Sequence, residues 1–251
     1  MTIYTALIRQ FFILLGLEGQ RRKCHKLEKK GLIKERDELA FLIAQNWGRN
    51  LIKSVGGKET TITVKGQENV PQDTAVVFIA NHQSFLDIPL MLGYAGRQAG
   101  FISKAEFSKI PIFSDWMRLL QCIFLKRGNP KQSIKAMADG VENIKRGYSM
   151  MIFPEGHRSK SSEVREFHPG SFKLAYRAEV PIVPVTISNT YKMYEETGHS
   201  QSTNLTLIFH PAIQTKGISR DEQKEIPIKV QALLAESVKS LAEANSNLKK
   251  A

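Results

Sequence analysis

Hydrophobic positions along the chain divide it into two parts with different periodicities. Residues 1–58 show helical patterns: an apolar stretch over residues 6–17, and then apolar residues every four positions over residues 39–55. From Thr61 onward, short β-branched or apolar runs alternate with helical segments. This alternation predicts βαβ units around a mostly parallel sheet. We therefore expect a helical hairpin over residues 1–58 and an α/β domain over residues 59–251.

The second part contains seven candidate strands. They cover residues 61–65, 75–80, 100–103, 123–126, 150–153, 182–187 and 205–209. Helices are expected to begin near Asp87, Lys104, Pro130 and Gly170, and a last helix over about residues 227–245 carries its apolar residues on one face. The predicted fold class is α/β, with a mostly parallel central sheet of about seven strands flanked by helices.

The composition excludes several classes of protein. Of 251 residues, 42% are hydrophobic and 24% are charged, which argues against disorder, a fibrous repeat and a multi-span membrane protein. Cys24 and Cys122 form neither a disulfide framework nor a CxxC metal pair, which favours a reducing compartment. The six histidines lie far apart without an HExxH pattern, so no metal is expected.

The formal net charge of +12 is unevenly distributed. Residues 1–60 carry 12 Lys and Arg against 6 Asp and Glu, and six of those cations fall within residues 21–30, directly after the apolar stretch. Nucleic acids, anionic lipids and phosphorylated substrates all attract basic proteins. An apolar segment followed by cations favours a membrane surface. Since no recognised nucleic-acid-binding motif is present, a nucleic-acid partner is not expected.

The apolar N-terminal stretch differs from both a signal peptide and a spanning helix. Arg9 and Gln10 interrupt it, and no A-x-A-like cleavage site follows Leu17. A spanning helix needs about 20 predominantly apolar residues. We therefore expect interfacial helices that attach the protein to the cytoplasmic face of a membrane.

Polar and charged residues follow four of the candidate strands. These segments are residues 81–87 (NHQSFLD), Lys104, residues 126–127 and residues 154–159 (PEGHRS). In open parallel sheets, ligands bind outside the carboxyl ends of the strands. The four segments would therefore bring a base, carboxylates and several cations to one edge of the sheet.

His82 and Asp87 could form a base with its orienting carboxylate. An imidazole can take a proton from an alcohol near neutral pH, especially when a carboxylate fixes its tautomer. A histidine in a loop can meet an aspartate at the start of the following helix. The alternative is purely structural, with Asp87 as an ordinary helix N-cap and His82 as a turn histidine.

The PEGHRS segment has features of an anion site. Arg158 can hold a phosphate through two hydrogen bonds, and the turn at Gly156 lets backbone amides approach an anion. Lys104 and Arg127 add cations at neighbouring strand ends. Taken singly, Lys104 and Arg127 would be interpreted as solvated surface charges, and Glu155 with Arg158 as a surface ion pair. Cations at the ends of three nearby strands would, however, together suit the binding of a phosphomonoester.

Together these segments resemble the glycerolipid acyltransferase family, particularly 1-acylglycerol-3-phosphate acyltransferases. NHQSFLD, IFLKR at residues 123–127, FPEGHRS at residues 153–159 and VPIVPV at residues 180–185 follow the order and spacing of that family's four motifs. One departure is His157, where the family usually has threonine. This departure makes the acceptor head group less certain than the reaction.

The resemblance implies transfer of a fatty acyl group from an acyl thioester, either acyl-ACP or acyl-CoA, to the sn-2 hydroxyl of lysophosphatidic acid. The product would be phosphatidic acid, an intermediate of phospholipid biosynthesis. His82, oriented by Asp87, would be the catalytic base. The resemblance also implies that Arg127, Glu155, Gly156 and Arg158 bind the glycerol phosphate, with Lys104 assisting, and that no cofactor is needed beyond the acyl donor.

Two other functions stay open at this point. His157 leaves room for a different lysolipid acceptor, such as a lysophospholipid or a lyso-ornithine lipid. The basic hairpin also permits a non-catalytic membrane adaptor. The choice between acyl carrier protein and coenzyme A cannot be made from the residues, because both are acidic.

Overall fold

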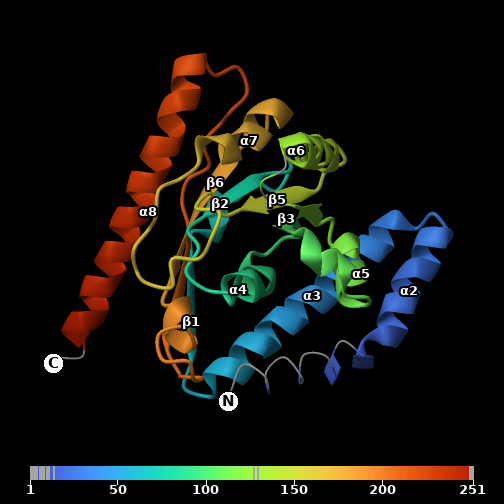
Figure 1. The fold of residues 1–251 in the computed structure, drawn as a ribbon, viewed down its shortest axis with the longest axis horizontal. Coiled ribbons are helices and arrows are strands. Elements are labelled where there is room, and N and C mark those ends of the chain that lie inside the picture. Colours follow the sequence, from blue (N-terminus) through green and yellow to red (C-terminus); the bar gives the residue numbers. More distant parts are fainter. Residues whose placement is uncertain are drawn as a thin grey trace.

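The computed structural model describes residues 5, 9, 12–13, 15–126, 128 and 130–248 (Figure 1). Its centre is a seven-stranded sheet in the order β1-β7-β6-β2-β5-β3-β4, in which only the pair β6 and β7 is antiparallel. The strands are β1 (Thr61–Lys65), β2 (Val77–Ala80), β3 (Ala99–Lys104), β4 (Ile123–Leu125), β5 (Ser149–Ile152), β6 (Ile182–Ser188) and β7 (Asn204–Phe209). The predicted α/β class and mostly parallel sheet are confirmed.

Helices cover both faces of this sheet (Figure 1). They are α2 (Glu18–Lys29), α3 (Ile33–Gly56), α4 (Asp87–Tyr94), α5 (Phe113–Leu119), α6 (Pro130–Lys145), α7 (Lys173–Ala178) and α8 (Arg220–Leu248). In β2, Phe78 and Ala80 pack with α3, α4 and α5, whereas Val77 and Ile79 pack with α6, α7 and α8. Successive side chains of a strand point to opposite faces, so this wholly apolar strand belongs at the centre of a sheet that is covered twice.

Three helix starts differ from the sequence prediction. The helix expected near Gly170 begins as a 3-10 helix, Pro169–Phe172, and α7 follows at Lys173. The segment after Lys104 begins as a short 3-10 helix, Ala105–Lys109, and α5 follows only after Pro111. The last helix begins at Arg220, well before Pro227. Ser219 and Glu222 form a capping box there: the Glu222 N–H donates to Ser219 Oγ at 3.2 Å and the Ser219 N–H to Glu222 Oε2 at 2.7 Å. The prediction of a start at Pro227 was therefore wrong.

The helix α3 packs onto the sheet domain. Its apolar face, including Ala40, Ile43 and Ile52, is buried in the same core as α4. Arg49 Nε also donates to the carbonyl of Gly93 at the end of α4, at 2.8 Å. The second predicted helix thus caps the core, which was the alternative to a free membrane hairpin. The division of domains at residue 58 stays a prediction.

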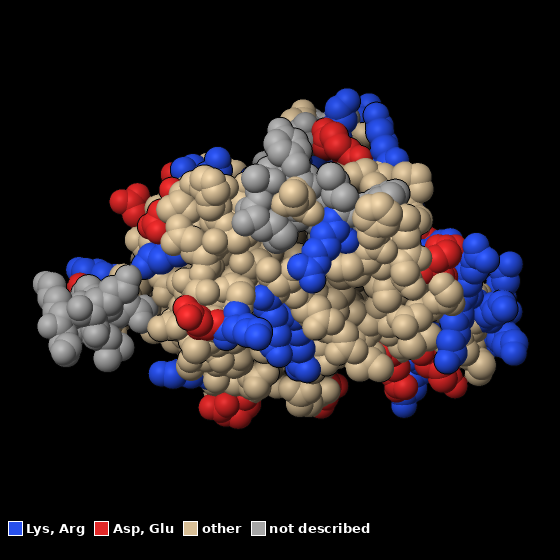
Figure 2. All heavy atoms as spheres, turned by 90° about the horizontal axis from the view of Figure 1, so that it is seen from below, with Lys and Arg blue, Asp and Glu red and all other residues tan. Residues whose placement is uncertain are grey.

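The basic residues 21–30 form most of α2 itself. Five of them are exposed: Arg22, Lys23, Lys26, Lys29 and Lys30. Figure 2 shows Lys and Arg side chains gathered at the right-hand edge of the molecule, where α2 and its turn into α3 lie. Half of the apolar stretch 6–17, namely residues 6–8, 10, 11 and 14, falls outside the described residues. Within the described part of the chain, no helix combines the length and apolar character needed to cross a membrane.

Gly48 allows α3 and α4 to approach closely. A Cβ at this position would lie 2.4 Å from the carbonyl oxygen of Pro89 and 2.9 Å from the amide nitrogen of Gly93, both backbone atoms. We expect Gly48→Ala to lower the free energy of unfolding by about 1–3 kcal/mol, because α4 must move. Chemical denaturation measures this change. Gly19→Ala in α2 is the matched control, because nothing lies within 4 Å of its Cβ position; an equal loss in that variant would contradict the packing argument.

Candidate active site

His82 and Asp87 meet directly at the end of β2. Asn81 ends the strand by exchanging two hydrogen bonds with the backbone of Ile187, at 2.9 and 2.8 Å. The chain then forms a loop, and α4 begins at Asp87. His82 Nδ1 lies 2.7 Å from Asp87 Oδ2. A neutral imidazole in this arrangement donates Nδ1–H to the carboxylate, which leaves Nε2 as the proton acceptor.

The Asp87 carboxylate organises the whole loop. It is fully buried, and its Oδ2 also accepts the backbone N–H groups of Gln83 and Ser84, at 2.7 and 2.9 Å. Its Oδ1 accepts the hydroxyl of Thr190. An ordinary N-cap side chain accepts an N–H from the first turn of the helix that follows it. The donors to Asp87 lie before it or after β6, so these bonds do not cap α4. The histidine ring is further fixed by stacking on Phe153, with 4.1 Å between ring centroids.

Glu155 is buried behind the loop. Its Oε1 accepts the backbone N–H of His82 at 2.7 Å, and its Oε2 accepts that of Arg165 at 3.2 Å. Burial raises the pKa of this carboxyl to about 7, although the two N–H groups oppose the shift. Its observed contacts join the two loops that follow β2 and β5.

A cleft of about 390 Å³ lies in front of His82. Its lining combines the imidazole with cations: His82, Lys104, His157, Arg158, Lys160 and Arg165. Two hydrogen bonds close the PEGHRS loop against the His82 loop, from Ser159 N to His82 O at 2.8 Å and from Lys160 N to Gln83 O at 3.2 Å. The structure therefore brings Lys104 and Arg158 to His82, as expected from the sheet edge.

The remaining predicted residues have different positions. Gly156 has a positive φ of 72°, which glycine adopts readily, and it makes the turn that directs the PEGHRS loop back toward His82. Arg127 lies outside the described residues. Sequence reasoning missed Lys160 and Arg165; the segment that follows PEGHRS (KSSEVRE, residues 160–166) carries as many Glu as Lys and Arg, so its charge gave no signal.

His157 forms part of the cleft wall and contacts a neighbouring cation. Arg165 NH1 lies within hydrogen-bond distance of His157 Nε2. Because a guanidinium can only donate, this ring nitrogen is the acceptor of the hydrogen bond. The residue that departs from the family motif thus helps to place Arg165 in the cleft.

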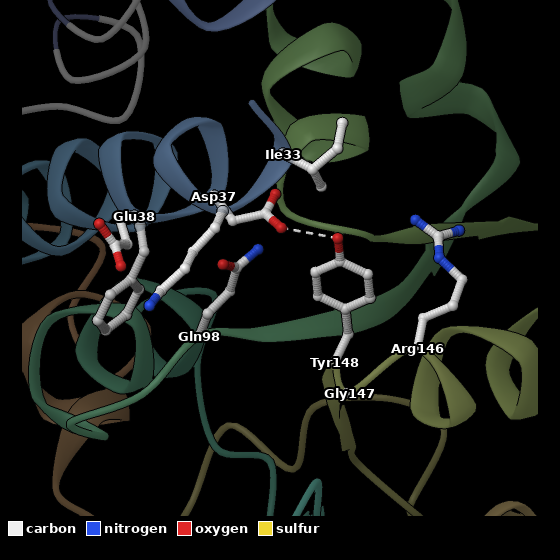
Figure 3. A pocket seen from close by; sticks show the side chains of 9 residues that line it. Ile33, Asp37, Glu38, Gln98, Arg146, Gly147 and Tyr148 are labelled. Atoms are coloured by element: carbon white, nitrogen blue, oxygen red, sulfur yellow. Dashed lines mark hydrogen bonds between the residues drawn. The ribbon is translucent and has the colours of Figure 1, made fainter. Parts of the chain in front are cut away.

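A second hollow, of about 460 Å³, lies at the opposite edge of the sheet. In Figure 3, Asp37 of α3 faces Tyr148, whose hydroxyl donates to the carboxylate at 2.7 Å, and Gln98 lies beside them. Gln98 and Tyr148 precede β3 and β5, whereas His82 follows β2. This hollow is therefore remote from the His82 cleft. Among the residues that the structure describes, no group of three or more His, Cys, Asp or Glu could hold a metal ion.

Comparison with known proteins agrees with this geometry. A family model described as Acyltransferase matches residues 61–188, which make up half of the chain and contain both loops. The chain belongs to the acyltransferase family. Its matched region includes the strand ends that carry His82, Asp87 and Arg158.

Relatives and a solved structure extend the match. The chain is 36% identical over 155 residues to the chloroplastic 1-acyl-sn-glycerol-3-phosphate acyltransferase LPAT1 of Arabidopsis thaliana. The matched region covers 61% of this chain and 43% of that protein. It is 30% identical over 185 residues to the 1-acyl-sn-glycerol-3-phosphate acyltransferase of Saccharomyces cerevisiae, covering 72% of this chain and 60% of that protein. The 1-acyl-sn-glycerophosphate acyltransferase PlsC from Thermotoga maritima superposes with a TM-score of 0.73 at 25% identity, over 94% of this chain and 98% of that one. The chain thus spans less than two thirds of these two curated relatives, but nearly all of the PlsC structure.

The raised pKa of Glu155 has a measurable effect on stability. The folded protein holds this proton up to about pH 7, whereas the unfolded chain releases it near 4.5, the ordinary pKa of a glutamate. Between these values the folded state binds more protons, so the free energy of unfolding falls as the pH rises. Between about pH 4.5 and 7, we expect the free energy of unfolding of wild type to fall by on the order of 2–3 kcal/mol relative to that of Glu155→Gln.

Denaturation at a series of pH values measures that difference. Glu163→Gln removes an exposed carboxylate from the same loop and should follow wild type. A constant difference between wild type and Glu155→Gln from pH 4.5 to 7 would show that burial does not hold the proton on Glu155.

Proposed function

We propose that the protein transfers a fatty acyl group from an acyl thioester to the sn-2 hydroxyl of lysophosphatidic acid, forming phosphatidic acid. The observation that carries the proposal is the carboxylate-oriented imidazole of His82 in the wall of a cleft that also contains four cations. The names of the relatives, which act on acylglycerol phosphates, support the same acceptor.

His82 would act as general base. Its Nε2 takes the proton of the acceptor hydroxyl while the hydroxyl oxygen attacks the thioester carbonyl carbon. The tetrahedral intermediate collapses with cleavage of the carbon–sulfur bond, and the imidazolium returns the proton to the leaving thiolate. Asp87 stabilises the imidazolium in between, because its carboxylate is already hydrogen-bonded to Nδ1–H.

The cations of the cleft would bind the phosphate. A phosphomonoester carries a charge of about −1.5 to −2 at neutral pH, and guanidinium groups hold such groups through paired hydrogen bonds. Lys104, Arg158, Lys160 and Arg165 surround the same cleft as His82. Binding the phosphate there places the glycerol hydroxyl close to the base. Arg127, which the resemblance assigns to the same role, completes the proposed set, with Glu155 and Gly156 shaping the loop.

Another lysolipid acceptor is the second candidate. It is favoured by His157, whose imidazole replaces the usual threonine hydroxyl beside the cations. Comparing kcat/KM for lysophosphatidic acid, a lysophospholipid and a lyso-ornithine lipid separates the two proposals, because a site built for a phosphomonoester loses heavily when that group is missing. Competition between acyl-ACP and acyl-CoA decides the donor.

Replacement of His82 tests the reaction directly. We expect His82→Ala to lower kcat/KM for lysophosphatidic acid by at least about 100-fold, because the general base is lost. The assay measures formation of phosphatidic acid from an acyl thioester, with thermal unfolding as a check on folding. His199→Ala, an exposed loop histidine, is the matched control.

Two results would contradict the proposed reaction. Full turnover by His82→Ala would remove His82 from the mechanism. Lipid binding by wild type without thioester consumption for any acceptor would instead favour the membrane adaptor.

We also propose that α2 attaches the protein to the cytoplasmic face of a membrane. Its exposed cations follow the apolar stretch of residues 6–17, and each cation near an anionic surface contributes about 1 kcal/mol. The same bilayer would supply the lipid acceptor. The attachment is assigned to α2 and the stretch before it, because α3 is buried in the core of the sheet domain; the boundary at residue 58 stays a prediction.

Charge removal tests the attachment. We expect the triple variant Lys26→Gln, Lys29→Gln, Lys30→Gln to bind vesicles that contain phosphatidylglycerol about 100-fold more weakly than wild type, from about 1 kcal/mol for each lysine. The matched control removes three exposed lysines of α6 and α7, Lys131, Lys145 and Lys173. Equal vesicle binding by the two variants, measured by co-sedimentation, would place the attachment elsewhere.

A further inference from the structure

The segment after β6 contacts both parts of the candidate site. We call residues 189–196 the β6 strap. It begins at Asn189, whose positive φ of 70° turns the chain sharply. Thr190 then donates to Asp87, and Glu195 reaches the loop that carries His82. The strap lies outside the four motifs that the sequence analysis identified.

Glu195 accepts hydrogen bonds from three groups of the site. Its Oε2 accepts the Ser84 hydroxyl at 2.7 Å, and its Oε1 accepts the Phe85 N–H at 3.0 Å. Arg158 NH1 also donates to Oε1, at 3.2 Å. The Glu195 side chain is 6% exposed, whereas that of Arg158 is 37% exposed. The carboxylate therefore lies behind a guanidinium that reaches the cleft.

Arg158 is held from a second direction by an aromatic ring. Its guanidinium carbon lies 5.9 Å from the centre of the Phe85 ring, which itself packs edge-on against Tyr194 of the strap, with 5.7 Å between centroids. For the other three cleft cations, Lys104, Lys160 and Arg165, no carboxylate partner occurs among the described residues. Among the four described cleft cations, Arg158 is thus the one that a carboxylate holds, whereas the contact of Arg165 is with the ring of His157.

Such a contact has opposing effects on phosphate binding. By charge alone, a carboxylate close to the cleft repels an anionic ligand. By holding the long arginine side chain in place before the ligand binds, the carboxylate also lowers the conformational entropy that is lost on binding. Only one of the five N–H donors of Arg158 is used by Glu195, so the others are available to a phosphate. The additional bonds to Ser84 and Phe85 couple this arginine to the His82 loop.

We infer that Glu195 is a positioning residue: it fixes Arg158 for the acceptor phosphate and sets its place relative to His82. This inference rests on the proposed function and deepens it. Glu195 would act through Arg158 and would not touch the reacting atoms.

Replacement of the carboxylate by an amide tests the inference. We expect Glu195→Gln to raise KM for lysophosphatidic acid about tenfold, the effect of losing one charge-assisted hydrogen bond, while KM for the acyl thioester stays the same. Glu196→Gln is the matched control, because it removes the same charge from the exposed neighbouring residue. A fall in KM for lysophosphatidic acid would show that repulsion dominates, and a KM equal to that of Glu196→Gln would show that Glu195 has no positioning role; either result overturns the inference.

A double-mutant cycle separates positioning from general structural damage. In the Arg158→Ala background, Glu195→Gln should no longer raise KM for the acceptor, because the arginine that it positions is absent. An increase of the same size in both backgrounds would mean that Glu195 acts only on the fold, and would overturn the inference.

Binding of glycerol 3-phosphate gives a readout that does not depend on turnover. Calorimetric titration should show weaker binding to Glu195→Gln than to wild type and to Glu196→Gln, and equal binding would overturn the inference. Failure of wild type to acylate lysophosphatidic acid would remove the proposed function, but this titration would still decide the role of Glu195.

Discussion

Four successive backbone N–H groups of the His82 loop donate to three buried carboxylates. His82 N binds Glu155, Gln83 N and Ser84 N bind Asp87, and Phe85 N binds Glu195. A buried carboxylate is costly unless its oxygens accept hydrogen bonds, and a buried N–H is costly unless it donates one. The buried carboxyl groups and the buried N–H groups of the loop therefore depend on one another. The loop can be rigid without regular secondary structure, and the imidazole at its start has a defined direction.

The sheet order makes this arrangement accessible. β2 lies between β6 and β5, so the loop after β2 has one neighbouring strand on each side. The segment after β5 supplies Glu155 and Arg158, and the β6 strap supplies Thr190 and Glu195. The parallel direction of these three strands places all three carboxyl ends at one edge. The site thus depends on three adjacent strands, and the helices on both faces mainly shield those strands from solvent.

The charges of the site form two layers. Cations line the cleft, whereas the three carboxylates lie behind them and are largely removed from solvent. A ligand in the cleft meets the cations first, and the carboxyl groups behind them hold the backbone and Arg158 in place. In the proposed reaction, this separation would let one small volume stabilise an imidazolium through Asp87 and attract a phosphate through its cations. The basic helix α2, none of whose residues line the cleft, forms a separate group of cations at the right-hand edge of the molecule (Figure 2).

The elements and the two central loops could be predicted from the sequence, because they depend on local patterns. Alternating apolar runs located the strands, and the residue types of NHQSFLD and PEGHRS indicated a base and an anion site at strand ends. A local signal was missed for α8, where the capping box of Ser219 and Glu222 lies before the apolar pattern.

The order of the strands and the long-range contacts were decided by the tertiary structure. Glu195 lies more than 100 residues from Ser84 in sequence, and no periodicity or motif links them. The antiparallel pairing of β6 with β7 is equally invisible in the hydrophobic pattern. Local patterns specify which face of a strand or helix is apolar, whereas hydrogen bonds between distant loops exist only after the apolar faces have packed in one order. The proposed base, His82, could therefore be read from the chain, whereas the contacts of the carboxyl groups that hold its loop were settled by folding.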